Sequence, residues 1–196
     1  MESVKNEMQR IAKKLLSEKK VDLLIGYERA TVPLKSRPCF IYSEDVTEEN
    51  IDEVVEKLEW DSFCTANLAA FLQKHFENIP NRRKKREEPY PTIGVVTKGC
   101  DLRSIVALMK ERQVVRENLV LIGVPCRGLI DRRKVESEVG EEPLSYFETE
   151  EELLKVTGKS GREYSFKKPE VLQPACVDCR FPMPENTDYL IEGEAK

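Results

Sequence analysis

The spacing of apolar residues in the first third of the chain predicts two helices and two strands. Apolar residues recur at helical spacing over 3–19, and the short apolar run 21–28 predicts the first buried strand. Residues 39–43 predict a second strand. The helix that follows Thr47 is expected to bury the apolar positions of 51–58.

The middle of the chain predicts a strand, a helix and a strand in succession. The two apolar strands cover 92–97 and 118–124, and the helix between them covers 101–113. This order is typical of a βαβ unit, whose parallel sheet is covered by helices. We therefore expect an α/β fold with a mainly parallel sheet, in which both strands end at the same edge.

Two segments before this unit predict a helix and a loop. The spacing of Leu68, Phe71 and Leu72 predicts a helix from about residue 65 to 78. Prolines then enclose five consecutive cations at 82–86, which indicates an exposed loop.

The regular pattern fades after Gly128. Residues 141–158 are expected to hold one short helix, and 162–166 one strand. The last 29 residues contain four prolines, so most of this segment cannot be helix or central strand. We expect a single domain, with an α/β core over 1–130 and an irregular, Pro-rich extension over 131–196 that completes a metal site.

Composition narrows the class of protein. Hydrophobic residues make up 40% and charged residues 35% of the chain, which is typical of a globular protein with a solvated surface. The net charge of −4 argues against nucleic acid as a partner. The sequence has no apolar run long enough for membrane insertion, and its N-terminus does not resemble a signal peptide. We expect a cytoplasmic protein.

Four of the six cysteines stand where metal ligands are expected. Cysteines in a reducing compartment are buried small residues or ligands rather than disulfides. Cys100 and Cys126 follow the two central strands, and Cys176 and Cys179 form a CxxC between prolines. Four thiolates suit a [4Fe–4S] cluster or a zinc ion. A plainer interpretation is that Cys100 and Cys126 are merely buried.

The other two cysteines are weaker candidates. Cys39 opens a predicted strand and is expected in the core. Cys64 precedes a predicted helix and is the reserve ligand if one of the four proves wrong.

Residues beside the predicted ligands are candidates for cofactor binding. Lys98 could pair with a negative charge, and Gly99 lets the backbone pass close to a bulky group. Cys100 follows at a helix N-terminus, which favours a thiolate. We also expect Lys98, Arg103, Arg127 and Arg180 to form a cationic surface that either attracts an acidic partner or offsets the charge of the cluster.

No complete catalytic constellation is recognisable. His75 is the only histidine and has no triad partner motif, and the sequence has neither a Walker A loop nor a G-x-G-x-x-G. With no complete catalytic constellation of its own, the chain looks like one component of a larger assembly.

Four short motifs resemble one known family. "KGCD" at 98–101, "IGVPC" at 122–126, "CVDC" at 176–179 and "DYLIEGE" at 188–194 are similar to motifs of the β-subunits of coenzyme F(420)-reducing (deazaflavin-reducing) hydrogenases and formate dehydrogenases. The similarity is best over 91–194.

The resemblance implies a cofactor and partners. Members of this family carry iron–sulfur clusters and, at full length, FAD, and they pass electrons between clusters and a flavin or deazaflavin. By resemblance, Cys126, Cys176 and Cys179 are cluster ligands, and Cys100 is the fourth. The partners implied are other redox subunits or ferredoxin, and such complexes are typical of anaerobes.

Two departures bear on the flavin. The sequence ends just after "IEGE", where longer members continue, and "SFCTANLAAFL" replaces an expected Gly-rich segment. We therefore expect the cluster more than FAD.

Three functions follow from these residues. The first is an iron–sulfur electron-transfer subunit of a redox complex. The second is a flavin-dependent oxidoreductase acting on deazaflavin or ferredoxin. The third is an interaction protein stabilised by zinc.

Overall fold

A five-stranded sheet forms the centre of the protein, with the strand order β2-β1-β3-β4-β8. The computed structural model describes residues 2–76, 90–149 and 153–193. Strands β1, β3, β4 and β8 run parallel, and β2 pairs antiparallel with β1 at one edge. The bounds of the strands are Leu23–Arg29 (β1), Ser36–Tyr42 (β2), Ile93–Thr97 (β3), Leu119–Gly123 (β4) and Tyr189–Leu190 (β8). The predicted α/β fold with a mainly parallel sheet is confirmed.

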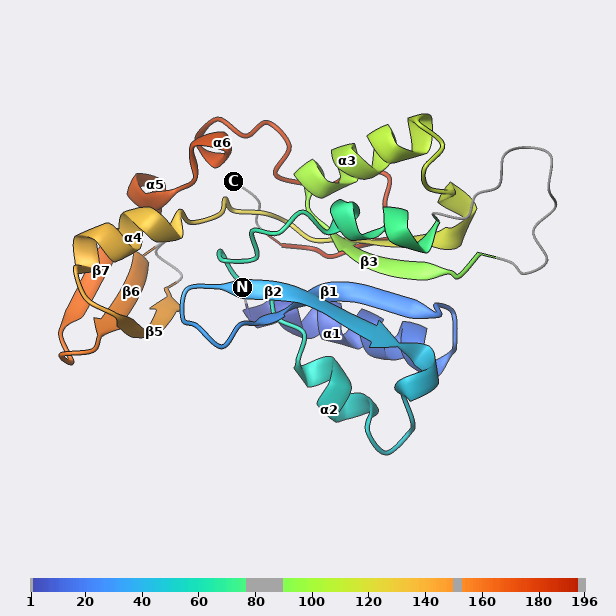
Figure 1. Ribbon diagram of the computed structural model, residues 1–196, viewed down its shortest axis with the longest axis horizontal. Coiled ribbons are helices and arrows are strands. Elements are labelled where there is room, and N and C mark those ends of the chain that lie inside the picture. The colour runs from blue at the N-terminus through green and yellow to red at the C-terminus, as the bar shows by residue number, and fades with distance from the viewer. Residues whose placement is uncertain (1, 77–89, 150–152, 194–196) are drawn as a thin grey trace.

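Helices pack on both sides of this sheet. Helix α3 (Gly99–Lys110) lies on one side, and α1 (Glu2–Ser17) and α2 (Ile51–Glu56) lie on the other (Figure 1). Helix α1 buries the stripe Val4, Met8, Ile11 and Leu15, as helical spacing requires. Every residue of β3 is buried, which is typical of a parallel strand covered on both faces.

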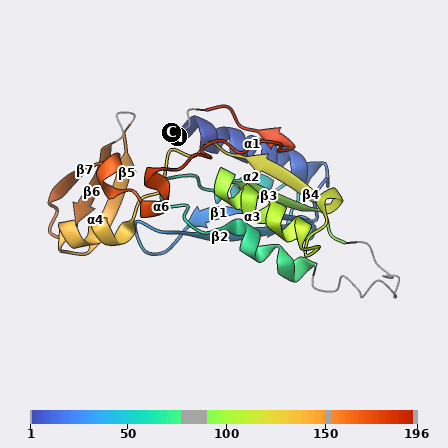
Figure 2. The ribbon, with the colours of Figure 1, turned by 90° about the horizontal axis from the view of Figure 1, so that it is seen from above.

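A second, antiparallel sheet lies at one end of the main sheet (Figure 2). It follows α4 (Arg132–Val139) and consists of β5 (Pro143–Glu148), β6 (Leu153–Gly158) and β7 (Glu163–Lys167). The predicted helix within 141–158 is therefore wrong, whereas the predicted strand at 162–166 is confirmed. Burial alternates along β6, and Leu154 and Val156 enter a separate hydrophobic cluster, so packing favours a sheet here.

The C-terminal segment crosses back to the main sheet through short elements. Helices α5 (Lys168–Val171) and α6 (Pro174–Val177) have a single turn each, and both carry proline in that turn. Backbone hydrogen bonds then fix the segment: the Asp188 N–H donates to the Leu121 carbonyl at 3.0 Å, and the Ile191 N–H donates to the Gly123 carbonyl at 2.9 Å. The segment is poor in regular structure but firmly attached.

The predicted long helix after residue 65 is also wrong. Residues Leu68–Phe71 and Gln73–His75 form two short 3₁₀ helices instead. The Asn67 side chain accepts a hydrogen bond from the Ala69 N–H and so starts a tight turn rather than an α-helix. The cationic run 82–86 lies outside the described residues. Among the helices that the structure describes, none has the length and apolar character needed to cross a membrane.

Candidate functional site

The register of the two central strands brings Cys100 and Cys126 to the same edge of the sheet. Thr97, the last residue of β3, pairs with Gly123, the last residue of β4. The Val124 N–H then donates to the Thr97 carbonyl at 3.0 Å, which keeps the two chains together beyond the strands. Cys100 is the second residue of α3, as the βαβ pattern predicts.

The segment after the CxxC packs against these strand ends. The Cys126 N–H donates to the Pro182 carbonyl at 2.8 Å. A Cβ atom on Gly99 would lie 2.1 Å from the Phe181 carbonyl oxygen, so only glycine allows this approach. The space that Gly99 leaves is thus occupied by the protein's own backbone.

All four predicted ligands line one cavity of about 160 Å³. Three segments contribute cysteines to its wall: the one after β3, the one after β4 and the one after α5. Besides the cysteines, it is lined by polar residues that the sequence did not single out, namely Thr65, Asn67 and Gln173. Residues 76 positions apart along the chain therefore meet at one place, as Cys100 and Cys176 do.

Burial keeps two of the thiols in the neutral form in the absence of a metal. Cys100 is the most exposed of the four residues, but partial burial of its thiol, followed by the charge of Asp101, raises its pKa to about 11. Burial likewise raises the pKa of Cys126, and Cys176 adds to the effect. Binding of a metal at neutral pH must therefore release protons from these thiols.

The thiols line the cavity without converging on a point. Within the described ranges, no group of three or more His, Cys, Asp or Glu side chains is arranged to hold a metal ion. The donor set nevertheless fits a thiolate-bound group, because four cysteines face one cavity and no carboxylate-rich set competes for the position. Cys176 lies in the one-turn helix α6, and Cys179 follows two residues after its last residue, Val177.

The two remaining cysteines lie elsewhere. Cys64 is fully buried, and its thiol donates to the Glu59 carbonyl at 3.7 Å rather than lining the cavity. Cys39 pairs with Gly26 across β1 and β2, in the sheet. The expectation that Cys39 belongs to the core is confirmed.

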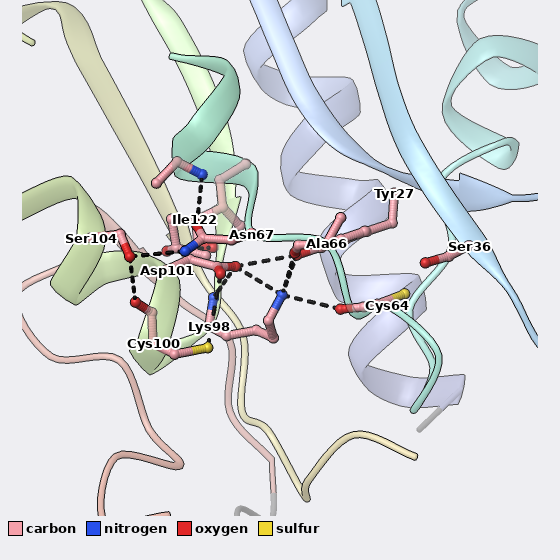
Figure 3. Close-up of polar contacts among 12 residues, drawn as sticks. Tyr27, Ser36, Cys64, Ala66, Asn67, Lys98, Cys100, Asp101, Ser104 and Ile122 are labelled. Carbon is pink, nitrogen blue, oxygen red and sulfur yellow. Dashed lines mark hydrogen bonds and ion pairs between the residues drawn. The ribbon is translucent and has the colours of Figure 1, made fainter. Parts of the chain in front are cut away.

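Lys98 lines the cavity, and a buried polar network holds its side chain (Figure 3). Its Nζ lies 2.9 Å from Asp101 Oδ2 and donates to the Ala66 carbonyl at 3.0 Å and to the Cys64 carbonyl at 3.1 Å. It also donates to the Tyr27 hydroxyl. Only 1% of Lys98 is exposed, so its expected place on a cationic surface is wrong.

This network was only partly visible in the sequence. Asp101 stands three residues after Lys98 and accepts a hydrogen bond from the Lys98 N–H at 3.3 Å, a helix-start pattern that its spacing could have indicated. Tyr27 comes from β1, 71 residues away, and no local signal identifies it.

The arginines of the expected cationic surface separate into two places. Arg103 and Arg180 line a groove beside α3, whereas Arg127 lines a different cavity near the start of α1. That cavity, of about 400 Å³, shares only Cys126 and its neighbours Gly128 and Leu129 with the cysteine cavity.

Comparisons with known proteins identify the fold. No family model matches the chain, and no curated protein matches it. Among solved structures, a chain of the F420-reducing [NiFe] hydrogenase complex from Methanosarcina barkeri is similar, with a TM-score of 0.56 and 14% identity. The match covers 87% of this chain and 57% of the hydrogenase chain, so this chain spans a little over half of that protein. At this identity the similarity shows a shared fold.

Proposed function

We propose that this protein is an iron–sulfur electron-transfer subunit of a multi-subunit redox complex. In this proposal one [4Fe–4S] cluster is bound by Cys100, Cys126, Cys176 and Cys179. The observation that carries it is the single cavity that all four cysteines line, because three separate segments must fold back to build it. Four thiolates are the usual ligand set of such a cluster.

The fold supports the same class of function. The similar chain is part of a hydrogenase complex, and the short motifs at 98–101, 122–126 and 176–179 resemble those of the same group of β-subunits. Each of these three motifs contributes at least one cysteine to the cavity wall. A bound cluster would supply one-electron transfer.

The residues of the chain have distinct roles in this proposal. Cys100 and Cys126 are held rigidly because each follows a strand of the main sheet. Cys176 and Cys179 close the cavity from a segment that hydrogen bonds attach to the sheet. Phe181 and Leu129 add apolar wall to the cavity and limit the access of water. Lys98 places a buried cation beside the thiolates and so offsets part of their charge.

Anaerobic purification followed by metal and sulfide analysis tests the proposal. We expect iron and acid-labile sulfide in the ratio of the cluster formula, together with a visible absorption band that bleaches on reduction. Serine in place of each of the four cysteines should lower the bound iron. Cys39→Ala is the matched control, because Cys39 is buried in the sheet away from the cavity.

The other two functions give different results in the same experiment. Detection of one zinc ion and no labile sulfide would indicate a structural zinc site, because four thiolates also bind zinc. Flavin released by denaturation would instead favour the flavin-dependent oxidoreductase.

A further inference from the structure

A groove beside the cysteine cavity combines apolar and cationic side chains. It has a volume of about 730 Å³ and lies between α3 and residues 180–186. Gly99 and Phe181 line both the groove and the cysteine cavity, so a single layer of residues separates the two. The groove is therefore the solvent-accessible surface next to the proposed cluster on the α3 side.

The base of the groove is apolar and partly exposed. Val106 is 38% exposed and Phe181 is 47% exposed, although both have large apolar side chains. Leu102, Met109 and Met183 extend the same surface. Helical spacing over 101–113 predicts that Val106 faces inward, and this prediction is wrong. A contiguous patch of exposed apolar side chains indicates a binding surface.

Cations surround this apolar base. The groove is lined by Arg103, Lys110, Arg116 and Arg180, against one acid, Glu185. Arg116 is paired with Asp188 at 2.8 Å. Arg103 stacks on Phe181, with its guanidinium carbon 4.3 Å from the ring centroid. Among the described residues, Arg103, Lys110 and Arg180 form no ion pair with a carboxylate. The groove is thus locally positive in a chain with a net charge of −4.

We propose that this groove is the docking site of an acidic redox protein. The inference rests on the proposed function, because a partner in the groove would lie close to the proposed cluster. An apolar centre with a charged rim is the usual composition of a transient protein interface. The positive rim selects a negatively charged partner and accelerates its association. One electron passes from the reduced partner to the oxidised cluster, and no bond is made or broken.

Association with a purified acidic ferredoxin tests the docking site directly. The variant carries Arg103→Glu and Lys110→Glu, and its matched control carries Lys35→Glu and Arg133→Glu. Both pairs are exposed and change the net charge equally, but only the first lies in the groove. Stopped-flow and surface-binding measurements should show about ten-fold slower association for the groove variant than for the control at low ionic strength. Salt screens the charges, so the difference between the two variants should shrink in about 0.5 M salt.

Further measurements separate the possible failures. Arg103→Gln with Lys110→Gln should give a smaller reduction than the charge reversal, which keeps the test valid if the reversed variant folds poorly. Equal association rates for the groove and control variants would overturn the docking site. Competition by free flavin mononucleotide would also overturn it, since the groove would then bind a small molecule. Iron analysis of the same preparations reports on the proposed function independently of the binding result.

Discussion

Lys98 Nζ and Asp101 Oδ2 lie 2.9 Å apart, and only 1% of either side chain is exposed. A buried ion pair adds little net stability over apolar residues, but loss of one partner leaves the other charge unpaired. The pair joins Lys98, two residues before Cys100, to Asp101, the residue that follows Cys100. It therefore fixes the turn that carries one predicted ligand.

Removal of the Lys98 charge should destabilise the protein strongly. We expect Lys98→Met to lower the free energy of unfolding by about 3–5 kcal/mol, because Asp101 would remain buried and charged. Urea unfolding followed by circular dichroism measures the loss. Lys159→Met is the control: Lys159 pairs with Glu142 on the surface, where such a pair contributes about 0–1 kcal/mol. Similar losses in both variants would contradict the importance of the buried pair.

Gly99→Ala should disturb the site through the backbone of the C-terminal segment. The new Cβ would lie 2.1 Å from the Phe181 carbonyl oxygen, which cannot move without shifting the segment after Cys179. We expect a loss of about 1–3 kcal/mol in the free energy of unfolding and less bound iron. Gly26→Ala is the comparison, because there the nearest atom, at 2.7 Å, belongs to the flexible Leu58 side chain. A milder effect at Gly99 than at Gly26 would refute this account.

Cys39 should make stability depend on alkaline pH. Burial, followed by the charge of Glu28, raises the pKa of Cys39 from 9.0 to about 12. The folded state therefore favours the neutral thiol, and the resulting stability is present below pH 9 and is lost as the pH rises toward 12. We compare the free energy of unfolding of the unsubstituted protein with that of Cys39→Val. The difference should be constant below about pH 8, and above about pH 9 the unsubstituted protein should lose stability relative to the variant. A pH-independent difference would exclude the effect.

Metal removal should loosen a narrow part of the chain. The sequence predicts that the metal-free protein is cut first between about 130 and 190. The antiparallel sheet and its hydrophobic cluster protect most of that range, so we now expect the first cuts at 173–182, around the CxxC. Limited proteolysis with mass spectrometry locates these cuts. Identical digestion with and without metal would show that the metal does not organise this segment.

The central fold was predictable because its strands are continuous apolar runs. Strands β3 and β4 are almost entirely buried, and such strands are recognisable without tertiary information. Because β3 and β4 are predicted to be parallel, Cys100 and Cys126 are expected at the same edge of the sheet.

The errors arose where local preference and packing disagree. The glutamates at 148 and 150–152 favour a helix locally, yet Glu148 ends β5 and pairs with Leu154 of β6. The apolar positions after Asn67 fit helical spacing, yet Leu68, Ala69 and Leu72 are buried from short 3₁₀ turns. The surroundings of Lys98 depend on Tyr27, and sequence spacing carries no information about so distant a contact.

The last strand has a consequence for the order in which the protein is assembled. Among the strands that the structure describes, β8 pairs with β4 alone, and the intervening 65 residues include the antiparallel sheet β5-β6-β7. Contacts between residues so far apart form late, because closing a long loop must precede any gain from them. During synthesis, Cys100 and Cys126 are therefore in place while the wall formed by Cys176 and Cys179 is still absent. For the proposed cluster, this order would leave two of the four thiols accessible to incoming iron and sulfide before the cavity closes.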